Sequence, residues 1–240
     1  MAGSLEAPQG SREHWHRQLY RATGDDVTPQ RPIFTGDVFT DVEVVLPGAK
    51  TKPRRLILLT HPCSMRSDGV RLQKRLLVAL VQDRAIATGE WPSDGYYDLM
   101  PLPDLTSPGS NEVTNFLDVT VVESKHLEVR NRIATLELFG LNLLLQRFVH
   151  QLTRVVVPTA DMAEATLPVF EEVDIIEDWI MTAAGRGLTV EEAAQECHNW
   201  LRGEVGGVSR QALLSEPQSR SRIRREASAA AAGQAQRSAD

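Results

Sequence analysis

The run His61-Pro62-Cys63 places an imidazole close to a thiol, a pairing that two kinds of chemistry use. A cysteine beside cationic side chains forms a thiolate more readily and can act as a nucleophile. The same run could be half of a metal site that Cys197 and His198 complete. Adjacent helical residues point in different directions, however, which makes Cys197 and His198 awkward joint ligands. We therefore favour a structural cysteine and expect no metal and no cofactor.

Basic residues are concentrated in one stretch of an otherwise acidic chain. The chain has 26 Lys and Arg against 32 Asp and Glu, a formal net charge of −6. Residues 50–84 hold nine basic side chains against two acidic ones, and residues 161–204 hold eleven acidic side chains against two arginines. Such a basic stretch is typical of a polyanion site, although solvated strand and helix faces would look the same. The candidate nucleic-acid contacts are Lys50, Lys52, Arg66, Arg71, Lys74 and Arg75.

Length and composition exclude several classes of protein. With 240 residues, 42% of them hydrophobic, the chain can form one substantial domain or a domain with a smaller appendage. No apolar run approaches the ~20 residues of a membrane helix, and the first residues do not form a secretory signal. Two cysteines cannot make a disulfide framework. We expect a cytoplasmic protein that makes no use of a membrane.

Residues 31–158 have the patterns of a strand-rich domain. Three segments alternate in polarity or form a short apolar run, which indicates β-strands. These segments are residues 36–46, 56–60 and 116–122. The apolar run from Leu56 predicts a strand buried on both faces, whereas residues 67–81 fit either a helix or a long strand. From Leu141 the apolar spacing becomes helical.

The remaining segments differ in charge and complexity. Residues 1–30 form a polar N-terminal segment, and residues 159–208 form an acidic helical region. Thr189 with two following glutamates predicts the start of a helix, because a hydroxyl caps free N–H groups and acids suit the helix dipole. Trp179 and Trp200 should lie on apolar faces that another surface covers. Residues 209–240, rich in Ser, Ala and Arg, predict a flexible basic tail that could be locally helical.

The order of features between residues 33 and 154 resembles the MazF/PemK (Kid) toxin family, small SH3-like β-barrels that cut RNA without a metal. The segments that carry the resemblance are Gly36-Asp37-Val38-Phe39, the loop 47–53, Arg54-Arg55 with Leu56 to Leu59, Leu117-Asp118-Val119, Glu123 to Leu127, and the helix from Leu141. The resemblance implies an α+β fold, an SH3-like barrel over residues 31–158 with the acidic helical region appended. It also implies action on RNA in a bacterial toxin–antitoxin, stress or anti-phage system.

Metal-free RNA cleavage requires a base for the 2′-hydroxyl proton, an acid for the leaving oxygen and a cation for the developing charge. Arg54 or Arg55 would supply the cation in this chain. Thr60 or His61, just past the apolar run, would supply a hydrogen bond or the base. Asp118 stands where the family carries an aspartate on a later strand.

The chain departs from the family pattern at two places that matter for catalysis. Leu56 stands where the family has a proline after its arginine, and the residues after Asp118 lack the arginine that the family uses in catalysis. Two functions therefore stay open. The first is a MazF/PemK-like protein that engages single-stranded RNA, as a metal-independent endoribonuclease if it is an enzyme at all. The second is a non-catalytic adaptor that binds a protein partner or a second copy of the chain.

Overall fold

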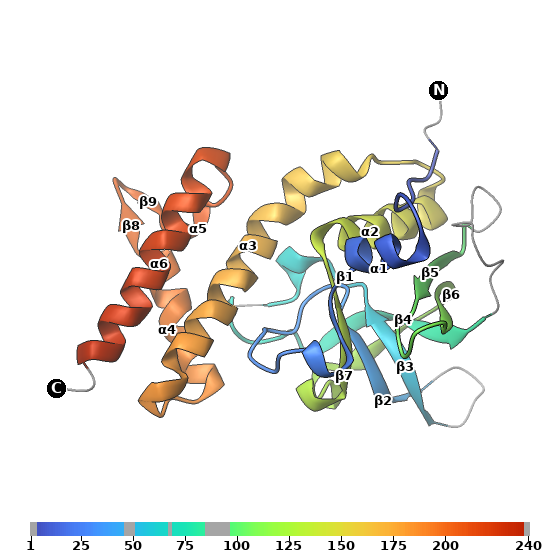
Figure 1. Cartoon of the computed structure of the whole chain (residues 1–240), viewed down its shortest axis with the longest axis horizontal. Coiled ribbons are helices and arrows are strands. Elements are labelled where there is room, and N and C mark those ends of the chain that lie inside the picture. The colour runs from blue at the N-terminus through green and yellow to red at the C-terminus, as the bar shows by residue number, and fades with distance from the viewer. Residues whose placement is uncertain (1–3, 46–50, 67–68, 85–96, 238–240) are drawn as a thin grey trace. The chain divides into compact units, whose positions relative to one another are not determined.

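The computed structural model describes residues 4–45, 51–66, 69–84 and 97–237 (Figure 1). They form two compact units whose segments alternate along the chain. The sheet unit consists of Met1–Val27, Ile33–Met65 and Gln73–Glu164, and the helical unit of Thr28–Pro32, Arg66–Leu72 and Ala165–Asp240. The sequence predicts domain boundaries after residues 30, 158 and 208. It does not predict that the short segments Thr28–Pro32 and Arg66–Leu72 belong to the helical unit.

The sheet unit contains a seven-stranded antiparallel sheet in the order β1-β7-β2-β3-β4-β6-β5. The strands are β1 Tyr20–Thr23, β2 Val38–Val44, β3 Lys52–Leu58, β4 Arg75–Asp83, β5 Leu99–Pro103, β6 Asn111–Glu123 and β7 Arg132–Leu136. Together with the helices, this sheet confirms the predicted α+β class. Among the described strands β1 and β5 are the edges, and no pairing between them closes a barrel.

The centre of the sheet is apolar on both faces, as the run from Leu56 predicts. Leu56, Ile57 and Leu58 are fully buried, and β3 pairs with β4 on one side and β2 on the other. The sequence of residues 67–81 fits either a helix or a strand, and the structure forms a strand, β4, that begins at Arg75. Leu76, Val78 and Ala79 are all fully buried, so both faces of β4 are covered and its sequence shows no alternation.

Two helices lie side by side over the sheet, α1 Arg12–Leu19 and α2 Leu138–Thr153 (Figure 1). Gly140 allows their close approach, because a Cβ at this position would stand 2.3 Å from the backbone oxygen of Leu19. The N-terminal segment is fastened to the same place. The Glu6 carboxylate accepts hydrogen bonds from the backbone N–H of Thr159 (2.7 Å) and the amide of Gln146 (3.1 Å).

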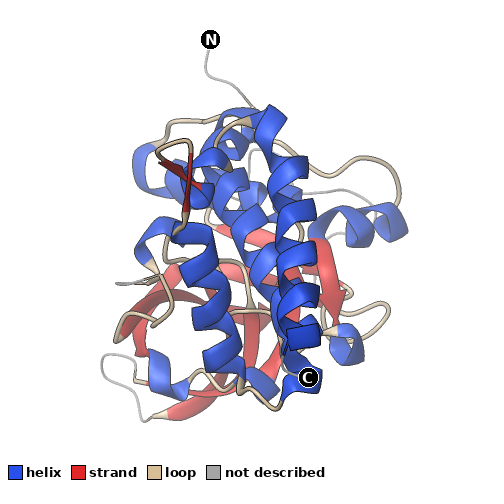
Figure 2. Cartoon of the chain, turned by 90° about the vertical axis from the view of Figure 1, so that its left-hand side faces the viewer, coloured by secondary structure: helices blue, strands red, loops and turns tan. Residues whose placement is uncertain are grey.

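The helical unit is built around an apolar core that α3, α4, α5 and α6 share. Its elements are α3 Thr159–Ala183, whose first turn lies in the sheet unit, α4 Val190–Arg202, the hairpin β8 Glu204–Val205 and β9 Val208–Ser209, α5 Arg210–Leu213 and α6 Pro217–Arg237. α3 and α6 lie side by side in Figure 1 and Figure 2. The rings of Trp179 and Trp200 meet at 5.6 Å between centroids, which confirms that their apolar faces are covered. Thr189 caps α4 in a capping box with Glu192.

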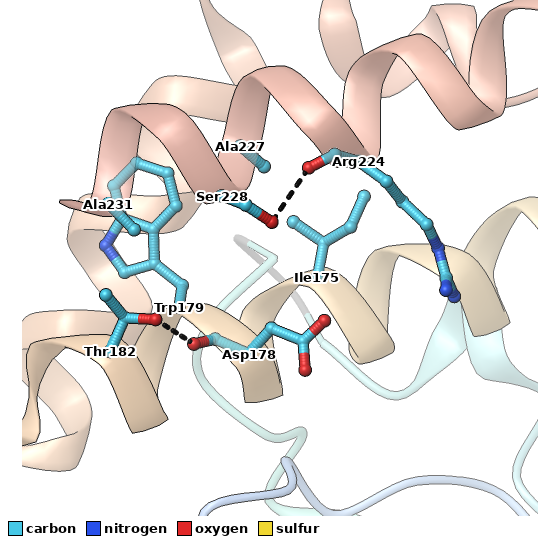
Figure 3. Close-up of a pocket in the computed structure, with 8 residues that line it drawn as sticks. All are labelled: Ile175, Asp178, Trp179, Thr182, Arg224, Ala227, Ser228 and Ala231. Carbon is cyan, nitrogen blue, oxygen red and sulfur yellow. Dashed lines mark hydrogen bonds between the residues drawn. The ribbon is translucent and has the colours of Figure 1, made fainter. Parts of the chain in front are cut away.

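The C-terminal residues form helix α6, where the sequence predicts a flexible tail. Ile223, Ala227 and Ala231 repeat at helical spacing and are buried in the core. The gap that remains between α3 and α6 has a volume of about 20 Å³, which suits a single water rather than a ligand (Figure 3). In the described residues, no helix is long and apolar enough to cross a membrane.

Candidate binding groove

The structure separates the residues that sequence reasoning assigns to catalysis. Arg54 and Arg55 lie near the start of β3, whereas Thr60 and His61 follow its end. A strand rises about 3.3 Å per residue, so the backbones of Arg55 and Thr60 stand roughly 17 Å apart. Cys63 lies in the turn Pro62–Ser64, beyond the end of β3, whereas both arginines lie near the start of that strand. A shared cleft for these side chains is therefore not formed.

Arg55 forms ion pairs with two carboxylates, one on β4 and one on β6. Its guanidinium donates to Asp83 at 2.6 Å and to Glu112 at 3.1 Å. Glu112 is only 1% exposed and accepts a further hydrogen bond from Ser110 at 2.7 Å. Arg55 thus neutralises a buried carboxylate, which is a structural role. Arg54 points to the opposite face of β3, is exposed, and makes no hydrogen bond or ion pair within the described residues.

Asp118 lies in a bulge of β6, where residues 116–118 have no partner on β4. Its carboxylate accepts hydrogen bonds from the amides of Gln82 (2.5 Å) and Asn115 (2.8 Å). Gln82 and Asp83 are neighbours on β4 and point to opposite faces, so Asp118 and Arg55 are attached to opposite faces of the sheet. This arrangement holds the bulge together and cannot place Asp118 beside Arg55.

Thr60 and His61 also make local bonds. The Thr60 hydroxyl accepts from the backbone N–H of Leu77 at 2.7 Å and so ties the end of β3 to β4. His61 is exposed, and its Nδ1 accepts from the backbone N–H of Cys63 at 3.3 Å, capping the turn Pro62–Ser64. Cys197 is buried in the helical unit, where burial, together with nearby Glu172 and Glu196, raises the pKa of its thiol. Within the described part of the chain, no three His, Cys, Asp or Glu residues are placed to hold a metal.

The predicted nucleic-acid contacts are divided between the units. Lys52 lies on β3 and Lys74 and Arg75 at the start of β4, whereas Arg66 and Arg71 belong to the helical unit. Lys50 lies outside the described residues. The basic stretch of the sequence is therefore not one continuous surface of one unit.

Thr60 and Arg75 do come together, in a groove on the sheet unit that we call the Thr60 groove. Its volume is about 610 Å³, within the usual range for binding sites. β2, the end of β3, β4, β6 and the turn after β6 all contribute to its walls. The lining residues are Glu43, Val45, Thr60, Arg75, Leu77, Val121, Val122, Glu123 and His126.

The Thr60 groove is lined by both aliphatic and charged side chains. Val45 and Val121 are 70% and 51% exposed, which is unusual for valines on a sheet. Glu123 is paired with Lys125 at 2.6 Å, and the hydrogen bond from Lys125 lowers the pKa of Glu123. Arg75 makes no hydrogen bond or ion pair within the described residues, although it stands opposite Glu123 in the β4–β6 register.

Sequence reasoning identifies two members of this groove and misses its other chemical groups, above all His126 and the exposed valines. The sequence contains little that would have indicated these groove residues, because Val121 has the same pattern as any residue of an alternating strand. Comparison of the chain with models of known protein families and with curated protein sequences gives no match. The resemblance to the MazF/PemK family therefore rests only on the residues quoted for it.

Proposed function

We propose that this protein is a non-catalytic binding module that holds an extended segment of a partner protein in the Thr60 groove. The observation that carries the proposal is the composition of the groove, which combines exposed aliphatic side chains with charges of both signs. Protein interfaces combine apolar and charged side chains in this way. A site for single-stranded nucleic acid would instead combine basic side chains with aromatic rings for base stacking. Among its described lining residues, the Thr60 groove has two carboxylates and no Phe, Tyr or Trp.

Charge complementarity specifies the partner segment. Glu123 forms an ion pair with Lys125, and nearby Arg75 and His126 also help to lower its pKa, whereas Arg75 has no carboxylate bonded to it among the described residues. An incoming carboxylate would therefore pair with Arg75, and an aliphatic side chain beside it would cover Val45 and Val121. The segment we expect is extended and carries Val, Leu or Ile close to Asp or Glu.

The separation of the catalytic candidates supports a module without catalysis. Arg55 is engaged by two carboxylates, and the other candidates lie at the far end of β3 or on the opposite face. General acid–base chemistry needs its groups within hydrogen-bond reach of one reacting site. The described residues of the Thr60 groove can bind a segment without any of these groups taking part in a reaction.

The experiment is selection of displayed random peptides of about 12 residues, a length that spans such a groove in extended form, against the full chain. We expect enrichment of an aliphatic residue next to an acidic one, and loss of the selected peptides with Arg75→Glu or Val121→Asp. Arg54→Glu is the matched control, since Arg54 is equally exposed but outside the groove. No enriched motif, or peptides that bind the Arg75→Glu chain equally well, would refute the proposal.

Engagement of single-stranded RNA by a MazF/PemK-like barrel is a second candidate. It is supported by Lys52, Arg54 and Lys74, which have no carboxylate bonded to them within the described residues. The SH3-like barrel itself stays a prediction, because the antiparallel sheet is compatible with it but does not close. If RNA binds, neutralising Lys52 and Arg54 together should lower the log–log salt slope by about 1.4, roughly 0.7 per phosphate. Labelled RNA in chelator tests both binding and cleavage, and an unchanged slope would exclude these contacts.

A further inference from the structure

A second groove of the sheet unit, which we call the His16 groove, lies apart from all residues discussed for function. One face of α1, the turn after β1 and the loop between β5 and β6 form its walls. The lining residues are Arg12, Glu13, His16, Arg17, Thr23, Gly24, Asp104, Leu105, Thr106, Ser107 and Pro108. Its volume is about 560 Å³, which matches sites for small molecules.

The β5–β6 loop that forms one wall is held in place by a set of hydrogen bonds. Arg12 donates through Nε to both oxygens of Asp104 at 3.0 Å and through Nη1 to Asn111 at 2.8 Å. The backbone N–H of Gly109 donates to the same carboxylate at 2.6 Å. Burial acts to raise the pKa of Asp104, but the bonds from Arg12 and Gly109 outweigh it and lower that pKa. The wall is therefore formed before any ligand arrives.

The charges of the His16 groove cancel in pairs. Arg12 is paired with Asp104, and Arg17 is paired with Glu13 at 2.9 Å. Both members of each pair lie in the lining, so the groove offers a ligand no excess charge from these side chains. The remaining groups are the hydroxyls of Thr23 and Ser107 and the aliphatic surface of Pro108, since Leu105 is only 2% exposed and the Thr106 hydroxyl donates to Glu112. Such a lining fits an uncharged ligand with a few hydrogen-bonding groups.

The side chain of His16 determines which ligand shape fits the groove. Its ring is half-buried, and the buried ring of Tyr20 packs against it at 4.9 Å between centroids. Tyr20 thus supports the imidazole from inside the unit, and Thr23 Oγ1 lies 3.4 Å from Nε2 and restrains the ring further. A flat, supported aromatic ring in a neutral groove favours a second flat ring against it.

From these contacts we propose that the His16 groove binds an uncharged planar heterocycle of nucleobase size. The heterocycle lies between His16 and the exposed ring of Pro108. The hydroxyls of Thr23 and Ser107 bond to its polar edge. This site is independent of the Thr60 groove.

The test is titration of the full chain with adenosine, guanosine, cytidine and uridine, followed by NMR or calorimetry. We expect at least one nucleoside to bind, with an affinity that changes less than about twofold between roughly 50 and 500 mM salt, because no net charge is neutralised. His16→Ala should weaken binding at least about tenfold. His14→Ala is the matched control, since His14 is exposed on the same helix and outside the lining.

A second variant distinguishes loss of binding from loss of folding. Thr23→Val keeps the shape of the wall and removes one hydroxyl, so it should weaken binding while the thermal midpoint stays unchanged. Two results would overturn the proposal: none of the four nucleosides binds up to its solubility, or binding is the same in His16→Ala as in the His14→Ala control.

Discussion

The two units of the chain differ in how their buried and exposed charges are arranged. In the helical unit, acidic side chains of α3 receive arginines from distant parts of the sequence: Arg31 is 2% exposed and donates to Asp174 at 2.7 Å and to Glu177 at 2.8 Å. Arg224 of α6 donates to Asp174 from the other side at 2.8 Å. In the sheet unit, Arg75 and Lys74 lie at the surface without such partners among the described residues. Charge is therefore buried in both units, since Arg132 and Asp37 form a buried pair at 2.8 Å in the sheet unit, and the sheet unit in addition leaves Arg75 and Lys74 exposed.

This difference changes the meaning of the uneven charge along the sequence. The acidic stretch 161–204 and the arginines of α6 suggest, when read separately, an acidic docking surface and a basic tail. In the folded helical unit they neutralise each other, and Arg186 with Glu196 adds a further pair. A net charge over a window of sequence thus indicates a binding surface only when the folded chain leaves it unpaired.

The largest expected effect comes from charging the core of the sheet unit. Leu58→Asp would place an unpaired carboxylate at a position with 0% exposure, and the penalty of several kcal/mol rivals a total stability of roughly 5–15 kcal/mol. We expect the sheet unit to unfold, as circular dichroism and solubility would show. A soluble variant that melts cooperatively near the wild-type midpoint would contradict the assignment of β3 to the core.

Removing the buried cation of the helical unit should have the next largest effect. Arg31→Met removes the buried guanidinium that donates to Asp174 Oδ1 and to Glu177, and breaking a buried pair destabilises by about 3–5 kcal/mol. Trp179 and Trp200 report on the unit by fluorescence during urea unfolding. Arg17→Met is the control, because its pair with Glu13 is about 75% exposed on both sides and should contribute under about 0.5 kcal/mol. If the two variants lower the free energy of unfolding equally, the ion pairs of Arg31 do not stabilise the helical unit.

Acid should weaken both units by a smaller amount. Burial acts to raise the pKa of Glu6, but hydrogen bonds from Thr159 and Gln146 lower it overall, and in the helical unit the bond from Arg186 lowers the pKa of Glu196. A carboxyl whose folded pKa is depressed stabilises above its unfolded pKa, near 4.5, and loses this contribution as the pH falls through the folded value. The urea midpoint should therefore decrease below about pH 4.5, and Glu6→Gln should reduce the decrease. A decrease of the same size in Glu6→Gln would exclude Glu6 as a source.

Local patterns in the sequence are enough to predict several of the helices and strands. Thr189 with Glu192 marks the start of α4, and the run from Leu56 marks a strand covered on both faces, because each depends on neighbours in sequence. For the C-terminal residues the sequence predicts a flexible tail with local helix, and the full length of α6 is not predicted because contacts with α3, such as Arg224 with Asp174, are contained in no local pattern. Composition there indicates disorder, and tertiary packing overrides it.

The candidate site could be predicted only in part for the same reason. Thr60 and Arg75 are recognisable because they flank apolar runs, but the Thr60 groove also needs Val45, just after β2, and Val121 from β6, which only the folded sheet brings together. Arg55 is the opposite case. Its residue type and place suggest catalysis, and the partners that occupy it, Asp83 and Glu112, are distant in sequence.

The most direct test of the binding module is a charge exchange between Arg75 and a bound peptide. A selected peptide with an aliphatic residue beside a glutamate should bind the wild-type chain and lose at least about tenfold in affinity to the Arg75→Glu chain. A lysine in place of that glutamate should restore binding to the Arg75→Glu chain and weaken it to the wild type. If the lysine peptide binds both chains equally, or neither, Arg75 does not pair with the partner and the proposed role of the Thr60 groove is wrong.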